Sequence, residues 1–189
     1  SNPESQQKMP QLLFFRSLCS GCGACSAVCP SGALKMTGEG LVMDRKACTN
    51  CGHCVNACPN NARQLSGRVV TVEEVCTEVR QHWRIFQTSG GGVTCGGGEA
   101  LSQPEFLCAL LQTLHDEIGF HTCLDSCGMA PWTAVEKILP YLDMVLLDIK
   151  HMDSVAHAAA TRVGNEPILA NARKLARTGV TVLVRLPLI

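Results

Sequence analysis

Apolar residues in the second half of the chain form two kinds of run that alternate. Short, mainly apolar runs are typical of buried strands, and they cover residues 121–125, 143–150 and 180–185. Longer runs, in which apolar residues recur every three or four positions, are typical of amphipathic helices and cover residues 104–114, 131–139 and 166–178. Strands that alternate with helices predict an α/β fold whose parallel sheet is buried on both faces.

The pattern before residue 89 predicts one hairpin and one further helix. Short apolar segments at residues 34–36 and 41–43 flank a Gly-Glu-Gly turn, as two paired strands would. Thr71 and Glu74 have the spacing of a capping box, in which the two residues cap a helix start reciprocally. Apolar residues then recur at helical spacing, at Val72, Val75, Val79, Trp83 and Phe86. We therefore expect a helix that begins after Thr71.

A glycine-rich stretch at residues 89–99 separates these two parts. It reads Ser-Gly-Gly-Gly-Val-Thr-Cys-Gly-Gly-Gly-Glu, so six glycines surround a short expected strand at residues 93–95 and lead to Glu99. Glycine lets a backbone approach a ligand closely or adopt a positive φ. A flexible linker is the alternative, but linkers are rich in serine and charge and lack an embedded strand. The stretch therefore predicts an open backbone edge beside a carboxylate.

The composition of the chain argues against some classes of binding partner. The chain has 189 residues, of which 46% are hydrophobic, enough for one domain and a smaller one with a real core. The formal net charge is zero, so no nucleic-acid or anionic-membrane partner is expected. No apolar run is long enough to cross a bilayer, and the polar residues 1–5 do not form a signal peptide.

Thirteen cysteines are the unusual feature of the composition. Eight of them form the run Cys-x-x-Cys-x-x-Cys-x-x-x-Cys-Pro, once at residues 19–30 and again at residues 48–59. This duplicated run is the pattern of two-cluster bacterial ferredoxins, whereas zinc sites commonly use two Cys-x-x-Cys pairs. It predicts two 4Fe–4S clusters and indicates a reducing cytoplasm.

In this pattern, the fourth cysteine of each run turns away and binds the cluster of the other run. One predicted cluster therefore takes Cys19, Cys22, Cys25 and Cys58. The second predicted cluster takes Cys48, Cys51, Cys54 and Cys29. Other cysteines lack ligand spacing, and we expect them to pack in the core at Cys76, Cys108 and Cys123 or to line a pocket at Cys127.

Charged residues stand at the carboxyl ends of the expected strands. They are Glu99, Asp125, Asp148 with Lys150, and Arg185. A single acid after a strand often only caps the next helix. Several of them in successive β/α units should meet on one face, because binding sites of such folds lie at the carboxyl ends of the strands. We therefore expect a binding site there.

Four features of the chain resemble the glycyl-radical enzyme activating enzymes, a family of radical S-adenosylmethionine enzymes. Residues 1–5 resemble the end of the motif Cys-x-x-x-Cys-x-x-Cys-x-Asn-Pro-Glu-Ser, and the twin cysteine runs follow it. The glycine stretch resembles Ser-Gly-Gly-Gly-Val-Thr-x-Ser-Gly-Gly-Glu-Pro-Leu. Residues 124–128 and 146–150 resemble Leu-Asp-Thr-x-Gly and Leu-x-Asp-x-Lys. The chain departs from the family's Ser, Pro and Gly at Gly96, Ala100 and Arg162.

The resemblance implies a partial (β/α) barrel of the radical S-adenosylmethionine type with a ferredoxin-like insert. Residues 1–16 would be a remnant of the segment after the family's cysteine motif, residues 17–66 the two-cluster insert, and residues 67–189 part of the barrel. The three cysteines that hold the family's catalytic cluster are absent from the sequence. No catalytic residue is therefore assigned, and the chain is expected to be a fragment that exchanges electrons without cleaving S-adenosylmethionine.

For the intact protein, the resemblance implies generation of a glycyl radical on a partner glycyl-radical enzyme. A third, reduced 4Fe–4S cluster would cleave S-adenosylmethionine, with electrons from a donor such as flavodoxin or ferredoxin. The residues expected to bind this cofactor are Gly97, Gly98, Glu99, Asp125, Ser126, Asp148, Ile149, Lys150 and Arg185. A monovalent cation is expected near Asp125 and Asp148, since two like charges would otherwise repel beside the ligand's carboxylate.

A protein of another class remains as the alternative interpretation. A ferredoxin-like electron carrier fused to a noncatalytic α/β domain would explain the cysteine runs. It would explain neither the Gly-Gly-Glu edge nor the Asp-x-Lys strand end.

Overall fold

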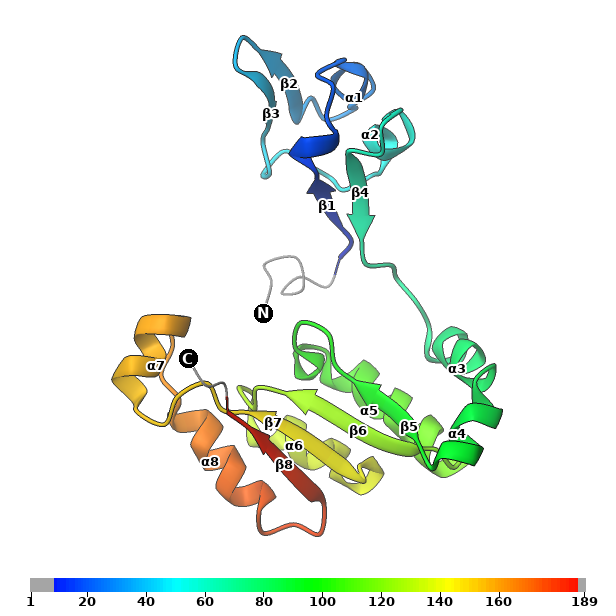
Figure 1. Cartoon of the computed structure of the whole chain (residues 1–189), viewed down its shortest axis with the longest axis vertical. Coiled ribbons are helices and arrows are strands. Elements are labelled where there is room, and N and C mark those ends of the chain that lie inside the picture. Colours follow the sequence, from blue (N-terminus) through cyan, green and yellow to red (C-terminus); the bar gives the residue numbers. More distant parts are fainter. Residues whose placement is uncertain (1–8, 187–189) are drawn as a thin grey trace. The chain divides into compact units, whose positions relative to one another are not determined.

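The computed structural model describes residues 9–186, which form two compact units (Figure 1). Of the described residues, 9–69 belong to the smaller unit and 70–186 to the larger one. The Ser-Asn-Pro-Glu-Ser motif at residues 1–5 and the last three residues lie outside the described part. Among residues 9–186, no helix has the length and apolar character needed to cross a bilayer.

The smaller unit contains two antiparallel strand pairs and two short helices. The strands are β1 (Gln11–Phe14), β2 (Leu34–Thr37), β3 (Gly40–Met43) and β4 (Arg63–Ser66), and the helices are α1 (Ala24–Ala27), α2 (His53–Asn56) and the 3-10 turn η2 (Arg16–Leu18). The expected hairpin is confirmed as the β2–β3 pair. Residues 11–14, which the resemblance to the family places in the segment before the insert, pair with β4 in this unit.

The internal duplication of the sequence is repeated in the backbone of this unit. Each repeat has a left-handed residue at three matching positions: Gly21 and Asn50, Gly23 and Gly52, Gly32 and Asn61. Glycine and asparagine are the residues that adopt this conformation at least cost. Gly23 and Gly52 stand directly before α1 and α2, so each turn leads from the cysteine loop into its helix.

The larger unit is built on a parallel sheet with the strand order β5-β6-β7-β8. These strands are β5 (Gly92–Cys95), β6 (His121–Ser126), β7 (Met144–Asp148) and β8 (Thr181–Arg185). The helices are α3 (Val72–Arg80), α4 (Trp83–Ser89), α5 (Pro104–Gln112), α6 (Trp132–Ile138), α7 (Ser154–Thr161) and α8 (Glu166–Leu175), with single turns η3 (Ala100–Ser102), η4 (Thr113–Glu117) and η5 (Leu139–Tyr141). The predicted mixed α/β fold with a parallel sheet is confirmed.

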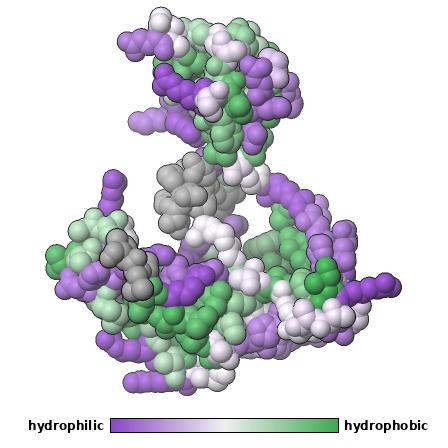
Figure 2. All heavy atoms as spheres, in the orientation of Figure 1, coloured by the Kyte–Doolittle hydropathy of each residue, from purple (hydrophilic) through white to green (hydrophobic). Residues whose placement is uncertain are grey.

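One face of this sheet carries the core. Leu124, Val145 and Leu147 share this face by their register and are buried with Leu111 of α5 and Ile138 of α6, helices that lie behind the sheet in Figure 1. The expectation that both faces are buried is wrong for β8, where the side chains of Leu183 and Val184 are 54% and 45% exposed. In the described part of the chain, β8 pairs only with β7 and is an edge strand. Figure 2 shows hydrophobic residues on the visible surface over β7 and β8.

The helices follow the sequence pattern with three differences. The capping box at Thr71 is confirmed, since the Glu74 amide donates to the Thr71 hydroxyl over 3.2 Å and the Thr71 amide donates to the Glu74 carboxylate. The helix after it breaks between α3 and α4, where Trp83 and Phe86 both turn onto the ring of Phe120. In addition, α8 ends at Leu175 instead of residue 178, and α7 was not expected from the sequence.

Candidate cofactor sites

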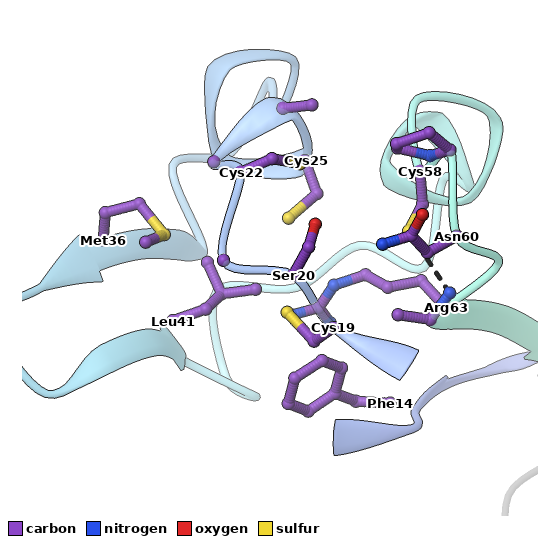
Figure 3. A pocket seen from close by; sticks show the side chains of 15 residues that line it. Phe14, Cys19, Ser20, Cys22, Cys25, Met36, Leu41, Cys58, Asn60 and Arg63 are labelled. Carbon is purple, nitrogen blue, oxygen red and sulfur yellow. Dashed lines mark hydrogen bonds between the residues drawn. The ribbon is translucent and has the colours of Figure 1, made fainter. Parts of the chain in front are cut away.

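Two hollows in the smaller unit are each lined by four cysteines. The first hollow is lined by Cys19, Cys22, Cys25 and Cys58 (Figure 3). The second is lined by Cys29, Cys48, Cys51 and Cys54. Each group thus takes three cysteines from one run and the fourth from the other, which is the exchange that the sequence pattern predicts.

Backbone amides donate hydrogen bonds to two of these sulfur atoms, and cysteine binds metals through sulfur as the thiolate. The amide of Ala62 donates to Cys58 Sγ over 3.2 Å, and the amide of Asn50 donates to Cys48 Sγ over 3.4 Å. Hydrogen bonds from the backbone and then the ring of His53 lower the pKa of the Cys51 thiol to about 7. Burial acts in the opposite direction on Cys54 and raises the pKa of its thiol.

The donor set of the hollows fits iron–sulfur clusters. All the sulfur ligands are free thiols, and four of them surround each hollow. A cluster of four irons needs its four thiolates spread around it, one for each iron.

A separate pocket lies at the carboxyl ends of the strands in the larger unit. Eight of the nine residues expected to bind the cofactor line it: Gly97, Gly98, Glu99, Asp125, Ser126, Asp148, Lys150 and Arg185. The ninth, Ile149, instead has its side chain buried in the core, while its amide donates to the Arg185 carbonyl over 3.0 Å. Asp125, Asp148 and Arg185 reach the pocket because they share the sheet face opposite the core.

The carboxylate of Glu99 is bound by the protein itself. Its Oε1 accepts hydrogen bonds from the Ser126 hydroxyl at 2.7 Å and the Leu101 amide at 3.2 Å. Its Oε2 accepts from the amide and the thiol of Cys127, both at 3.0 Å. Burial raises the pKa of the Cys127 thiol, and the nearby carboxylate raises it further. Glu99 therefore ties the glycine loop to the end of β6.

The charges of Asp125 and Asp148 are balanced by residues of the pocket. Arg185 Nη2 lies 2.5 Å from Asp125 Oδ1, and Arg185 Nε lies 2.7 Å from Asp148 Oδ1. Lys150 Nζ lies 2.7 Å from Asp148 Oδ2. Burial alone would raise the pKa of Asp148, but the hydrogen bonds from Lys150 and Arg185 together hold it below its usual value. Arg185 thus bridges the two acids near which the resemblance to the family implies a monovalent cation.

The pocket also has residues that the sequence analysis did not assign to it. His157 and Thr161 line it from α7, the helix that was not expected. His157 is buried and its Nδ1 lies 2.7 Å from the Val163 carbonyl, so it packs the wall of the pocket. Cys127 lines the pocket, and Cys76, Cys108 and Cys123 are buried, as expected. No spacing rule could have indicated His157, because α7 carries little apolar periodicity.

Comparisons with known proteins found one family model and several curated relatives. Residues 18–81 match the family model described as "4Fe-4S dicluster domain". The (2S)-3-sulfopropanediol dehydratase activating enzyme of Klebsiella oxytoca is 41% identical over 194 residues, covering 100% of this chain and 61% of the relative. The choline trimethylamine-lyase activating enzyme of Oleidesulfovibrio alaskensis is 38% identical over 192 residues, covering 100% of this chain and 62% of the relative.

Among solved structures, this chain is similar to a domain of pyruvate-formate lyase-activating enzyme from Bacteroides vulgatus. It shares 37% sequence identity, the match covers 52% of this chain and 61% of that chain, and the TM-score is 0.49. The chain spans about three fifths of the length of the curated relatives quoted above. Along its whole length, this chain is therefore a homologue of the glycyl-radical enzyme activating enzymes.

Proposed function

We propose that this chain is the cofactor-binding part of an activating enzyme for a glycyl-radical enzyme. The observation that carries the proposal is the pocket at the strand ends, which gathers the glycine edge, three acids and two cations of the larger unit. Similarity to activating enzymes along the whole chain supports the same function. The cofactors, when bound, supply the reductive cleavage of S-adenosylmethionine to a radical that removes hydrogen from a glycine of the partner.

The residues of the pocket would bind and orient S-adenosylmethionine. Gly97 has a φ of +98° and no atom within 4 Å of the place where a Cβ would stand, so the backbone edge is open to a ligand. Glu99 would position this edge, because its carboxylate is already held by four hydrogen bonds. Arg185 and Lys150 would attract the carboxylate of the ligand, while Asp125 and Asp148 would keep both cations in place.

The two cysteine hollows would hold one 4Fe–4S cluster each. Backbone amides directed at their sulfur atoms support this assignment. Two clusters within one small unit would pass electrons from a donor such as flavodoxin or ferredoxin, and the full-length protein would contain a third cluster. Clusters and free thiols of this kind belong in a reducing compartment, so the cytoplasm is the proposed location.

The test uses a protein that carries this chain at the full length of its relatives. The protein is reconstituted without oxygen, its iron and sulfide are measured, and 5′-deoxyadenosine is quantified after addition of dithionite and S-adenosylmethionine. Asp148→Asn should reduce product formation at least tenfold, since it releases Arg185 and Lys150 from their shared acid. Glu136→Gln, an exposed acid on α6, is the control and should retain activity.

The outcomes of this test distinguish an activating enzyme from a ferredoxin-like electron carrier. Formation of 5′-deoxyadenosine, together with a glycyl radical on a candidate partner, supports the activating enzyme. Redox-active clusters without any 5′-deoxyadenosine contradict it and favour the ferredoxin-like electron carrier. Zinc in place of iron and sulfide contradicts the cluster assignment.

A further inference from the structure

Arg63 is a buried cation at the start of β4, five residues after Cys58. Only 2% of its surface is exposed, and its Nε is buried with no hydrogen-bond partner. The guanidinium lies 4.5 Å from the centre of the Phe14 ring, and Nη1 lies 3.8 Å from the sulfur of Met43. Within the described residues, no acid forms an ion pair with it.

A charge in this position requires an anion. An isolated ionised group is costly to bury, and arginine cannot lower that cost by losing its proton. An aromatic ring and a thioether sulfur attract a cation, but they supply no negative charge. The environment of Arg63 is therefore incomplete without an anionic group next to it.

The hollow of Cys19, Cys22, Cys25 and Cys58 lies next to Arg63. The side chain lines this hollow, and Figure 3 shows it reaching from β4 toward Cys19 beside the Phe14 ring. The hollow of Cys29, Cys48, Cys51 and Cys54 has no arginine or lysine among its lining residues. The charge of Arg63 also reaches Cys54 of the second hollow, where it opposes part of the effect of burial on the pKa of that thiol. As a lining residue, however, this buried cation belongs to the first hollow and not to the second.

We infer that Arg63 raises the reduction potential of the cluster held by Cys19, Cys22, Cys25 and Cys58 above that of the second cluster. This inference rests on the proposed pair of clusters. Reduction adds one electron from the donor to a cluster, and with it one negative charge, which a fixed cation next to the cluster stabilises. No proton moves, because arginine stays charged. Electrons that enter the smaller unit therefore collect on the cluster next to Arg63.

The experiment measures the midpoint potentials of both clusters in the reconstituted chain by an EPR-monitored titration with dithionite. Arg63→Gln should lower one midpoint by about 59 mV or more, a tenfold change in the ratio of reduced to oxidised cluster. Arg63→Lys keeps the charge and should retain most of the potential. Lys35→Gln removes an exposed charge from the same unit and should change the ratio less than twofold. Cys51→Ser identifies the signal of the second cluster, because it alters a ligand of that cluster alone.

Iron and sulfide analysis of each variant precedes the titration. Failure of the native chain to load two clusters contradicts the proposed cluster assignment and not the role of Arg63. With both clusters loaded, equal midpoints in the native chain and Arg63→Gln overturn the inference. A shift of the second cluster instead of the first also overturns it. If Arg63→Lys and Arg63→Gln lower the midpoint potential equally, Arg63 acts by packing on Phe14 and not by its charge, which also overturns the inference.

Discussion

Glu99 acts at the scale of a single residue by joining two loops of the pocket. Its four hydrogen bonds come from Leu101, Ser126 and Cys127, so it connects the residue after the glycine loop to the end of β6. The carboxylate that the sequence suggests as a ligand contact thus acts first on the protein's own backbone. Donors that lose this acceptor would be left without a partner in a partly buried site.

Replacement of Glu99 tests this role. Glu99→Ala should lower the free energy of unfolding by about 1–3 kcal/mol, because it leaves the amide of Cys127 and the hydroxyl of Ser126 unpaired. Urea unfolding followed by circular dichroism measures the change. The exposed Glu136→Ala should change the stability by less than about 0.5 kcal/mol, and an equal loss in both variants would contradict the prediction.

The ion pairs of Asp148, also a single residue, predict that the stability of the fold depends on pH. Its folded pKa is held below the usual value of 3.8, so between the two values the unfolded chain binds the proton more readily than the folded chain. The stabilisation is therefore complete above pH 3.8 and is lost as the pH falls through the folded pKa. Asp148→Asn should be less stable than the native chain at neutral pH, and the difference should shrink below pH 3.8.

The control for this measurement is Asp153→Asn. Asp153 caps α7 by accepting a hydrogen bond from the Ala156 amide at 2.8 Å, and asparagine caps a helix nearly as well. The difference in the free energy of unfolding between Asp153→Asn and the native chain should therefore stay small at neutral pH. A difference for Asp148→Asn that does not change with pH would show that the ion pairs do not stabilise the fold.

At the scale of an element, the end of α7 explains one departure from the family pattern. Arg162 follows α7 with a φ of +68°, the left-handed conformation in which glycine is preferred. The glycine of the family pattern would have a physical reason at this position, since a left-handed residue with a Cβ costs about 1–2 kcal/mol. Arg162 adopts this left-handed conformation at the end of α7 despite that cost in free energy.

Arg162→Gly should therefore raise the free energy of unfolding by about 1 kcal/mol. Thermal and urea unfolding measure the gain. The matched control is Arg173→Gly in the exposed part of α8, where glycine should instead cost about 0.5–1 kcal/mol. A loss of stability in Arg162→Gly would contradict the strain at the end of α7.

At the scale of the whole molecule, the two units differ in how much core they have. The larger unit buries eighteen described residues in one cluster, whereas the core of the smaller unit consists of Leu12, Cys25, Leu34 and Cys54. Two of those four are proposed cluster ligands. Units of this size usually need a metal or disulfides for stability, and this chain has free cysteines.

Removal of iron should therefore affect the two units differently. After chelation of the reconstituted protein, amide hydrogen exchange in residues 9–69 should rise to the level of an unfolded chain, while β6 and β7 remain protected. Hydrogen-exchange mass spectrometry of the loaded and stripped protein measures this difference. Unchanged protection in the smaller unit would show that its core suffices without clusters.

The sequence alone determined the features that depend on neighbouring residues. The cysteine spacing predicted both groups of four, and the capping box predicted the start of α3. The apolar runs predicted three of the four strands of the sheet, and the glycine-rich stretch predicted the fourth, β5. Parallel strands bring their carboxyl ends together, so the meeting of Glu99, Asp125, Asp148 and Arg185 in one pocket also followed from the order of elements.

Only the tertiary structure decided which of these groups bind one another. The bridge from Arg185 to two acids, the hydrogen bonds of Glu99 across 27 and 28 residues, and the β1–β4 pairing all join distant segments. Their partners depend on how the elements pack, which no local period or spacing records. The same reason applies to Arg63, which is buried in the lining of the first hollow, while its charge also reaches Cys54 of the second.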